Sequence, residues 1–332
     1  MAGTGITTSS DLSYRQQAQI VQKLLAETYR LEVFGKYATG QTLKARNTMT
    51  MKWKGYDKLP IIKTAAVEGV TPTSQKLTSR DVSLTLKQLI SVQELTDVMD
   101  DTHEDDIFNV QTERGAKQMA QSIEFDSFAT LKACSNVFYA NGAAVTDVNT
   151  VLTATIQKKV LRALKRQDTG LITKKVSSTP NFNTESVLPG IIAVGHTDLE
   201  GDIRAMTGFI DAKEYGNTKP EEGEIGAVGQ VRYILTNICE ADTDAGGVKG
   251  TMVSTSGTSA DVYSVIYFGA DAWDRVAFKG AFAATPMILK PNVARHGDPA
   301  GQRGSVAFKT MIGTVILNDT HMAVVKCAAT DL

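Results

Sequence analysis

The sequence contains few of the residues that usually carry chemistry. Its 332 residues include only three cysteines, Cys134, Cys239 and Cys327, which are odd in number and far apart. No zinc-binding spacing and no disulfide framework can be drawn from them. We therefore expect three buried free thiols in a reducing compartment.

Long apolar runs and an excess of one charge are also missing. No stretch of about 18 uncharged apolar residues occurs, so the sequence predicts no membrane-spanning helix. The first residues, MAGTGITTSSDLSYRQQ, lack the basic start and apolar core of a signal peptide, so we expect a protein made and kept in a cytoplasm. With 35 basic and 36 acidic residues the net charge is −1, which argues against a strong nucleic-acid binder.

The common catalytic and cofactor motifs do not occur. There is no GxxxxGK[ST] phosphate loop, no GxSxG nucleophile elbow and no HExxH zinc motif. The glycines of GEIGAVG (Gly223, Gly226 and Gly229) have the spacing GxxGxxG and precede a strand, unlike a dinucleotide-binding loop. The sequence therefore predicts no enzyme, with no catalytic, cofactor-binding or metal-binding residue.

One short segment, HTDLEGD, is the best alternative to that prediction. His196, Asp198, Glu200 and Asp202 could hold a metal or act as acid and base, which would make the protein a metal-dependent hydrolase. Alternate residues on a helix do not share a face, however, so these side chains would converge only in a loop. The favoured interpretation is a strand end followed by a helix over 197–206, capped by Thr197 or Asp198.

The chain length and the hydrophobic patterns indicate a mixed α+β protein of about two domains. Apolar residues near a 3.6-residue period predict helices over 14–34, about 107–138, and 152–167. The long second helix has an apolar stripe that includes Met119, and the acidic patch Asp100 to Asp106 suits its N-terminal dipole. Apolar or alternating runs predict strands near 49–54, 188–196, 230–238 and 263–269, and a C-terminal hairpin around Asn318-Asp319.

Between Met49 and Val92 the chain makes a long polar excursion with no chemistry on it. Met49, Met51 and Trp53 alternate with polar residues, and the pattern resumes at Val82, Leu84 and Leu86. Gly69 and Pro72 mark the turn between the two β-patterned arms. Because an isolated two-stranded ribbon is marginal in water, we expect it to lie on another subunit.

A basic helix face is the other surface of interest. KKVLRALKR places Lys158, Lys159, Arg162, Lys165 and Arg166 on the predicted helix 152–167. The simplest interpretation is a solvated helix face. The alternative is a surface that faces a packaged polyanion or an acidic neighbour, with weak and salt-sensitive contacts.

The order of several motifs resembles the major capsid proteins of tailed phages. The stretch TAAVEGVTPTSQKLTSRDVSLTLKQLISVQELTDVMDD is similar to their extended-loop region, with Glu68, Gly69, Pro72, Thr96 and Asp97 in order ahead of the long helix. GIIAVGHTDLEGDIR and EIGAVGQVRYILTN resemble the axial domain, and WDRVAFKG and HMAVVKCAA the C-terminal part. The resemblance covers about residues 45–330, and the coat proteins of phages related to coliphage N4 look most similar.

This resemblance implies an HK97-like capsid fold and a division of the chain. The implied parts are an N-terminal arm (1–47), an extended loop (48–92), a peripheral domain with the spine helix (93–185 and 286–332) and an axial domain (186–285). The extended loop would lie across an adjacent subunit, with contacts from Glu68, Gly69, Pro72, Lys76 and Arg80. The basic residues on helix 152–167 would form an inner-surface face.

The function implied is a shell protein that assembles as pentamers and hexamers around double-stranded DNA. Partners would be many copies of itself, separate scaffolding, portal and decoration proteins, and packaged DNA through weak contacts, with no membrane. The protein would be assembled in the bacterial cytoplasm and end in the virion. An encapsulin-type shell that recruits an enzyme cargo is the alternative.

Overall fold

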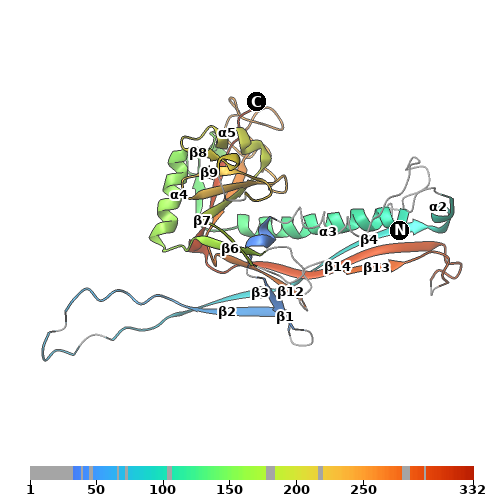
Figure 1. Cartoon of the computed structure of the whole chain (residues 1–332), viewed down its shortest axis with the longest axis horizontal. Helices are drawn as coiled ribbons and strands as arrows, with labels where there is room; N and C mark the ends of the chain where they lie inside the picture. Colours follow the sequence, from blue (N-terminus) through green and yellow to red (C-terminus); the bar gives the residue numbers. More distant parts are fainter. Residues whose placement is uncertain are drawn as a thin grey trace.

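The computed structural model describes residues 33–38, 40–44, 48–65, 67–71, 74–102, 107–176, 184–215, 220–278, 285–294 and 297–332. The predicted helix 14–34 lies almost wholly outside these residues, as do Pro72 and Glu104 to Asp106. Figure 1 shows an upper unit, a long helix with strands beside it, and a thin two-stranded projection. Within the described residues, no helix is long and apolar enough to cross a membrane.

The upper unit contains an eight-stranded sheet and is called here the eight-stranded unit. Its strands lie in the order β5 (Val137–Tyr139), β15 (Met322–Cys327), β11 (Tyr263–Phe268), β7 (Thr184–Gly195), β10 (Val231–Leu235), β9 (Glu224–Val228) and β8 (Phe209–Asp211), and β6 (Ile172–Val176) also pairs with β7. The central strands β10, β11 and β15 are fully buried, as their continuous apolar runs predict. The glycines of GEIGAVG lie in and around β9. They belong to the antiparallel hairpin β9–β10 and not to a turn between a strand and a helix.

Two cores cover the two faces of this sheet. On one face Ile156, Val160 and Leu164 of α4 (Ala154–Arg166) and Ile203 of α5 (Glu200–Arg204) pack on Ile191, Tyr233 and Val265. On the other face Phe34, Phe128 and Trp273 pack on Ile192, Val194 and Phe268. Neighbouring residues of β7 therefore point into different cores, as the two-residue period of a strand requires.

The long helix and a five-stranded sheet form the second part, called here the five-stranded unit. The sheet order is β1 (Gln41–Leu43), β12 (Trp273–Phe278), β14 (Arg303–Ile316) and β13 (Thr285–Leu289), and β4 (Lys87–Thr96) also pairs with β14. The spine helix α3 (Ile107–Lys132) lies on this sheet, and Met119 and Ile123 are buried against Val306 and Phe308. At Gly115 an added Cβ would come within 2.4 Å of the Phe308 ring, so only glycine permits this approach.

The projection is the antiparallel pair β2 (Thr50–Tyr56) and β3 (Ser79–Thr85) with the segment between them, called here the β2–β3 loop. Thr50 pairs with Thr85 and Tyr56 with Ser79, which confirms the two extended arms. The segment that joins them is less polar than predicted, because it carries several exposed apolar side chains. The arms are shorter than predicted, because the pairing stops at Tyr56 on one side and at Ser79 on the other. Residues 87–92 belong instead to β4, whose ten register pairs with β14 hold them in the protein's own sheet.

Several other boundaries differ from the predicted ones. The spine helix ends at Lys132 rather than near 138, because Val137–Tyr139 forms the parallel strand β5 beside β15. The C-terminal hairpin is wrong: β14 pairs with β4, β12 and β13, whereas β15 pairs with β11 and β5. A short helix, α2 (Asp97–Thr102), precedes the spine helix, although no helix was predicted ahead of residue 107 in this region.

The predicted domain boundaries do not coincide with the two sheets. β12 falls within 186–285 but lies in the five-stranded sheet, and α4 and β15 fall outside that range but lie with the eight-stranded sheet. The chain crosses between the two units more often than the predicted division allows, because strands distant in sequence pair with one another.

Candidate assembly surfaces

The β2–β3 loop is held only at its base. The backbone of Asp57 donates to Thr78 at 3.0 Å, and beyond it the described residues form a single tight turn from Val67 to Val70. Gly69 occupies this turn at φ +80°, a conformation that side chains with a Cβ rarely adopt. Figure 1 shows the loop reaching away from the rest of the molecule.

This loop carries apolar side chains that nothing in the protomer covers. Ile61 is 83% exposed and Ile62 is 79% exposed, and the other large apolar residues described as more than half exposed in this loop are Tyr56, Leu59, Val67, Val70 and Leu77. Burial of one such isoleucine side chain is worth about 1.5–3 kcal/mol. A two-stranded ribbon with so many uncovered apolar groups is therefore suited to dock on another surface.

The predicted contact residues occupy this loop as follows. Glu68, Gly69 and Lys76 are exposed around the tip, and Pro72 lies outside the described residues. Arg80 is near the base, where its Nη2 donates to the backbone oxygen of Leu317 at 3.3 Å. A second contact with the protein's own body joins Lys58 and Asp168 at 2.8 Å, with both side chains mostly exposed.

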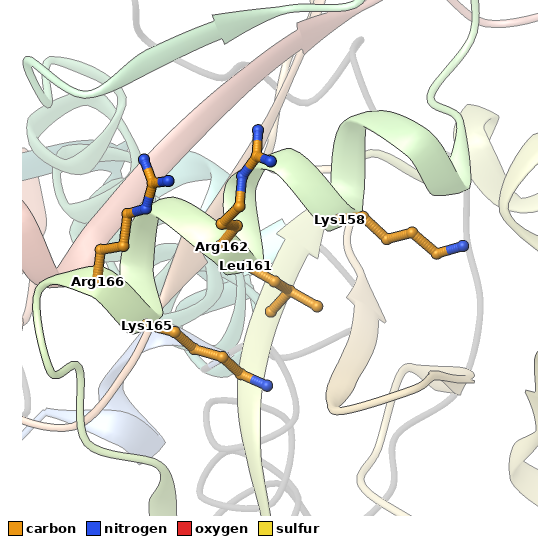
Figure 2. Close-up of a pocket in the computed structure, with 5 residues that line it drawn as sticks. All are labelled: Lys158, Leu161, Arg162, Lys165 and Arg166. Atoms are coloured by element: carbon orange, nitrogen blue, oxygen red, sulfur yellow. The ribbon is translucent and has the colours of Figure 1, made fainter.

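The predicted basic residues do share one helix surface. Lys158, Lys159, Arg162, Lys165 and Arg166 are all exposed on α4, and no ion pair joins any of them to a described acidic residue. Figure 2 shows four of them around Leu161, and these five side chains line one shallow depression. Leu161 is half-buried, so the depression has an apolar floor and a cationic rim. The five basic residues Lys158, Lys159, Arg162, Lys165 and Arg166 are called here the basic face.

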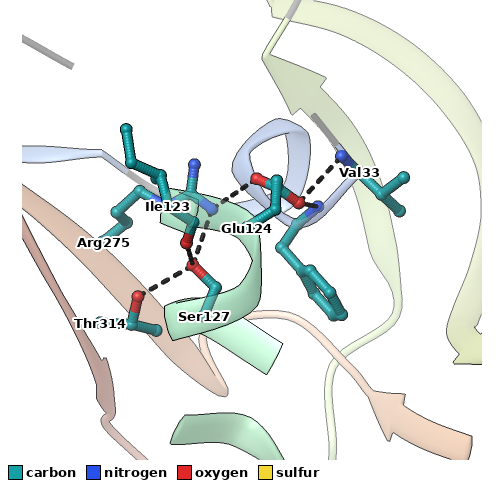
Figure 3. Close-up of polar contacts among 7 residues, drawn as sticks. Val33, Ile123, Glu124, Ser127, Arg275 and Thr314 are labelled. Atoms are coloured by element: carbon teal, nitrogen blue, oxygen red, sulfur yellow. Dashed lines mark hydrogen bonds and ion pairs between the residues drawn. The ribbon is translucent and has the colours of Figure 1, made fainter. Parts of the chain in front are cut away.

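A buried polar cluster fixes the N-terminal part of the described chain to the spine helix. Glu124 accepts from the backbone nitrogens of Val33 and Phe34 at 3.1 and 3.0 Å, and from Arg275 Nη2 at 2.6 Å. Ser127 accepts from the same Arg275 nitrogen and bonds to Thr314, as Figure 3 shows. Glu124 and Arg275 are almost fully buried, so their ion pair offsets part of the cost of removing both charges from water.

Sequence reasoning missed this cluster and a second buried pair. Arg232 on β10 bonds to Glu224 on β9 through Nε at 2.7 Å, and Tyr215 donates to the same carboxylate at 3.0 Å. The available signal was a charged residue inside an apolar strand run, as in VRYIL and WDRVAF. Such a residue predicts a buried partner, although it does not say which one.

The residues of HTDLEGD do not converge on a metal site. His196, not Thr197 or Asp198, caps the 3-10 helix Thr197–Leu199 by accepting from the backbone of Asp198. Asp198 accepts from Tyr263 at 2.6 Å, and Asp202 accepts from Thr330. Burial and the bond to Asp198 raise the pKa of Tyr263. The favoured interpretation, a strand end followed by a capped helix, is confirmed in outline. The capping residue differs, and the predicted helix 197–206 is a 3-10 turn followed by α5, which ends at Arg204.

The three cysteines are buried free thiols, as predicted. Burial raises the pKa of Cys327 to about 12, and burial together with a hydrogen bond to Asp319 does the same for Cys134. These thiols are therefore protonated and unreactive at neutral pH.

No family model and no curated protein matches the chain. Solved structures do match, over nearly the whole chain. The capsid of Ralstonia phage GP4 has a TM-score of 0.63 at 13% sequence identity, and the match covers 99% of this chain and 96% of the phage chain. The cyanophage Pam1 capsid also has a TM-score of 0.63 at 13% sequence identity, and the match covers 100% of both chains. The head of Helicobacter pylori bacteriophage KHP40 has a TM-score of 0.59 at 12% identity, and the match covers 99% of this chain and 98% of the phage chain.

These matches define the fold class. The chain has the HK97-like capsid fold that the sequence resemblance implied, with the mixed α+β architecture. The relation to the N4-related subgroup stays a prediction.

Proposed function

We propose that the protein is the major capsid protein of a tailed phage, which assembles into an icosahedral shell. The observation that carries the proposal is the exposed β2–β3 loop on a chain whose whole length aligns with phage capsid subunits. A soluble monomer gains nothing from extending uncovered apolar side chains on a ribbon, whereas a shell subunit buries them against a neighbour.

In this proposal the subunits form pentamers and hexamers. The eight-stranded unit supplies the axial part, the five-stranded unit with its spine helix supplies the peripheral part, and the β2–β3 loop reaches an adjacent subunit through Glu68, Gly69, Pro72, Lys76 and Arg80. Each contact of this kind is heterologous, and it forms rings when the rotation between neighbouring subunits closes after five or six copies. Many weak contacts then add up over the shell. The described polar clusters serve folding and assembly, and the role is structural rather than enzymatic.

The proposed partners follow from the same role. A shell of this kind encloses double-stranded DNA, requires scaffolding and portal proteins from other genes, accepts decoration proteins, and becomes part of the virion after assembly in the bacterial cytoplasm. Contact between this nearly neutral chain and packaged DNA would be weak and salt-dependent.

Expression of the chain followed by sedimentation and electron microscopy tests the proposal. Closed shells or rings of five and six subunits are the expected result. A compact monomer under all assembly conditions would contradict it, and shells that copurify with an enzyme cargo rather than associate with DNA would favour an encapsulin-type compartment.

A further inference from the structure

Asp168 occupies a position at which helices usually have glycine. Helix α4 ends at Arg166, and the backbone nitrogens of Asp168 and Thr169 donate to the carbonyls of Lys165 and Leu164 at 3.2 and 3.3 Å. These two bonds form a Schellman motif, in which the residue at this position adopts the left-handed conformation. Asp168 has a φ of 55°, which favours glycine because glycine has no Cβ.

The carboxylate of Asp168 also opposes the helix dipole. The C-terminal end of a helix carries a partial negative charge, which favours cations such as Lys165 and Arg166 rather than an anion. The helix end therefore gives no reason for an aspartate, and an unfavourable residue of this kind points to a role for its side chain.

That side chain contacts the base of the β2–β3 loop. Asp168 Oδ2 accepts from Lys58 Nζ at 2.8 Å, and Lys58 lies two residues beyond the end of β2. On the other arm, Arg80 Nη2 donates to the backbone oxygen of Leu317 at 3.3 Å. Each arm thus has one cation bound to the body of the protomer, on the side where Figure 1 shows α4.

The two acceptors belong to turns that are bonded to a common third turn. The backbone of Ala270 donates to Gly170 at 2.9 Å, and the backbone of Leu317 donates to Ala272 at 2.9 Å. Residues 269–272 lie between β11 and β12, so they join the turn after α4 to the turn after β14. The acceptors of Lys58 and Arg80 are therefore fixed relative to each other.

A restraint at the base has a large effect at the tip of the loop. The backbone of Asp57 donates to Thr78 at 3.0 Å and Thr78 Oγ1 donates to Asp57 Oδ2 at 2.7 Å, so the two arms are held together beside Lys58. At about 3.3 Å per residue, the arm from Lys58 to Gly69 reaches up to about 36 Å. A rotation of about 10° at the base would then move the tip by about 6 Å, more than the spacing of about 4.8 Å between paired strands.

We propose that Lys58 and Arg80 form a clamp that fixes the direction in which the β2–β3 loop leaves the protomer, with Asp168 and the backbone oxygen of Leu317 as its acceptors. Lys58 and Asp168 are 77% and 75% exposed, so their ion pair adds little to the stability of the fold. It selects instead among orientations of a ribbon that has few other contacts. The consequence for assembly rests on the proposed shell function, because a loop held in one direction loses less conformational entropy when it docks on a neighbouring copy.

Pulsed electron paramagnetic resonance between two spin labels measures the direction of the loop in the isolated subunit. The labels are attached at Lys63→Cys in the loop and Lys213→Cys in the eight-stranded unit, both exposed positions, whereas the three native cysteines are buried. The intact clamp should give one narrow distance distribution. Lys58→Ala should lower the ratio of clamped to unclamped molecules by about threefold to fivefold, and Lys76→Ala, at another exposed lysine of the loop, should leave the distribution unchanged.

Further variants separate the clamp from a role of Asp168 in the helix end alone. Lys58→Asp and Asp168→Lys should each widen the distribution, because like charges then face each other, and the two together should restore a narrow one. Asp168→Gly should widen it while the melting temperature stays the same or rises, because glycine suits the left-handed position. An unchanged distribution in both Lys58→Ala and Asp168→Gly would overturn the clamp.

Sedimentation of the same variants under assembly conditions distinguishes the clamp from the shell function. Lys58→Asp should slow assembly, and the exchanged pair Lys58→Asp with Asp168→Lys should restore the rate of the unchanged protein. If the unchanged protein never assembles, the shell function fails, whereas the clamp is still decided by the distance distributions. If a subunit with a widened distribution assembles at the unchanged rate, the consequence proposed for assembly is wrong.

Discussion

The spine helix and the β2–β3 loop are two long segments of one chain with opposite environments. Along α3 the side chains of Met119, Phe128 and Leu131 are almost fully buried. Between β2 and β3 the large apolar side chains are mostly exposed, and Ile61 and Ile62 are the most exposed of those described. The helix therefore owes its stability to contacts within the protomer, whereas the loop lacks such contacts and depends on what lies outside it.

This contrast predicts that equal chemical changes have unequal effects in the two segments. Substitutions in the spine helix should lower the free energy of unfolding of the isolated subunit. Substitutions in the loop should leave that free energy nearly unchanged and act only on assembly. The predictions below run from the largest expected effect to the smallest.

Met119→Asp should prevent folding, because it places a charge in the core between α3 and the five-stranded sheet. The buried carboxyl costs several kcal/mol, and the lost packing of Met119 costs about 2–5 kcal/mol more. Together these approach the free energy of unfolding of a typical domain, which is about 5–15 kcal/mol. Soluble yield and circular dichroism measure the effect. Val110→Asp is the matched control on the same helix, because Val110 is 39% exposed, and it should fold.

Glu124→Ala should destabilise the subunit by about 3–5 kcal/mol, because it removes a carboxylate that forms a buried ion pair with Arg275. It also removes the acceptor of the Val33 and Phe34 amides, so hydrogen exchange at these amides should accelerate. Denaturant unfolding measures the stability change. Glu113→Ala removes a partly exposed i,i+4 pair with Lys117 from the same helix and should cost about 0.5 kcal/mol or less. Equal effects of the two substitutions would contradict the role given to the cluster.

Ile61→Ser with Ile62→Ser should leave the unfolding transition of the isolated subunit unchanged and should reduce assembly. Gly69→Val should act in the same way, because valine does not tolerate the φ of +80° in the turn at the tip. Size-exclusion chromatography under assembly conditions measures the effect. Assembly profiles that match the unchanged protein would show that the loop is not a contact surface.

Lys58→Ala should give the smallest change in the stability of the subunit, together with a shift in the titration of Asp168. The hydrogen bond from Lys58 holds the pKa of this exposed carboxyl below its ordinary value, so the substitution should move that pKa upward. The small stabilisation from this pair is present above the ordinary pKa and is lost as the pH falls through the lowered one. Carbon NMR of the Asp168 carboxyl follows the titration, and a melting temperature unchanged at neutral pH is expected.

Much of the architecture could be predicted because its patterns are local. The alternation in TMTMKWKGY and the 3.6-residue stripe of α4 specify their elements without reference to the rest of the chain. Strand partners could not be predicted, because β14 and β15 are neighbours in sequence but belong to different sheets. The failed hairpin around Asn318-Asp319 has this cause: two β runs with a turn between them do not reveal whether the strands pair.

The candidate surfaces and the buried polar pair likewise differ in how well the sequence predicts them. The basic face follows from the spacing of its five cations, and the structure places all of them exposed on α4. The extent of the β2–β3 loop was overestimated, because the exposed Ile90 and Val92 look like ribbon residues although β14 pairs with their backbone. Glu124 and Arg275 lie 151 residues apart, and no local pattern joins two such residues.

Hydrogen–deuterium exchange of backbone residues 57–78, in the isolated subunit and in the assembled particle, tests the central claim most directly. The account predicts fast exchange throughout this segment in the subunit and strong protection in the particle, with the spine helix protected in both. Protection of the segment already present in the isolated subunit, or fast exchange that persists after assembly, would contradict it.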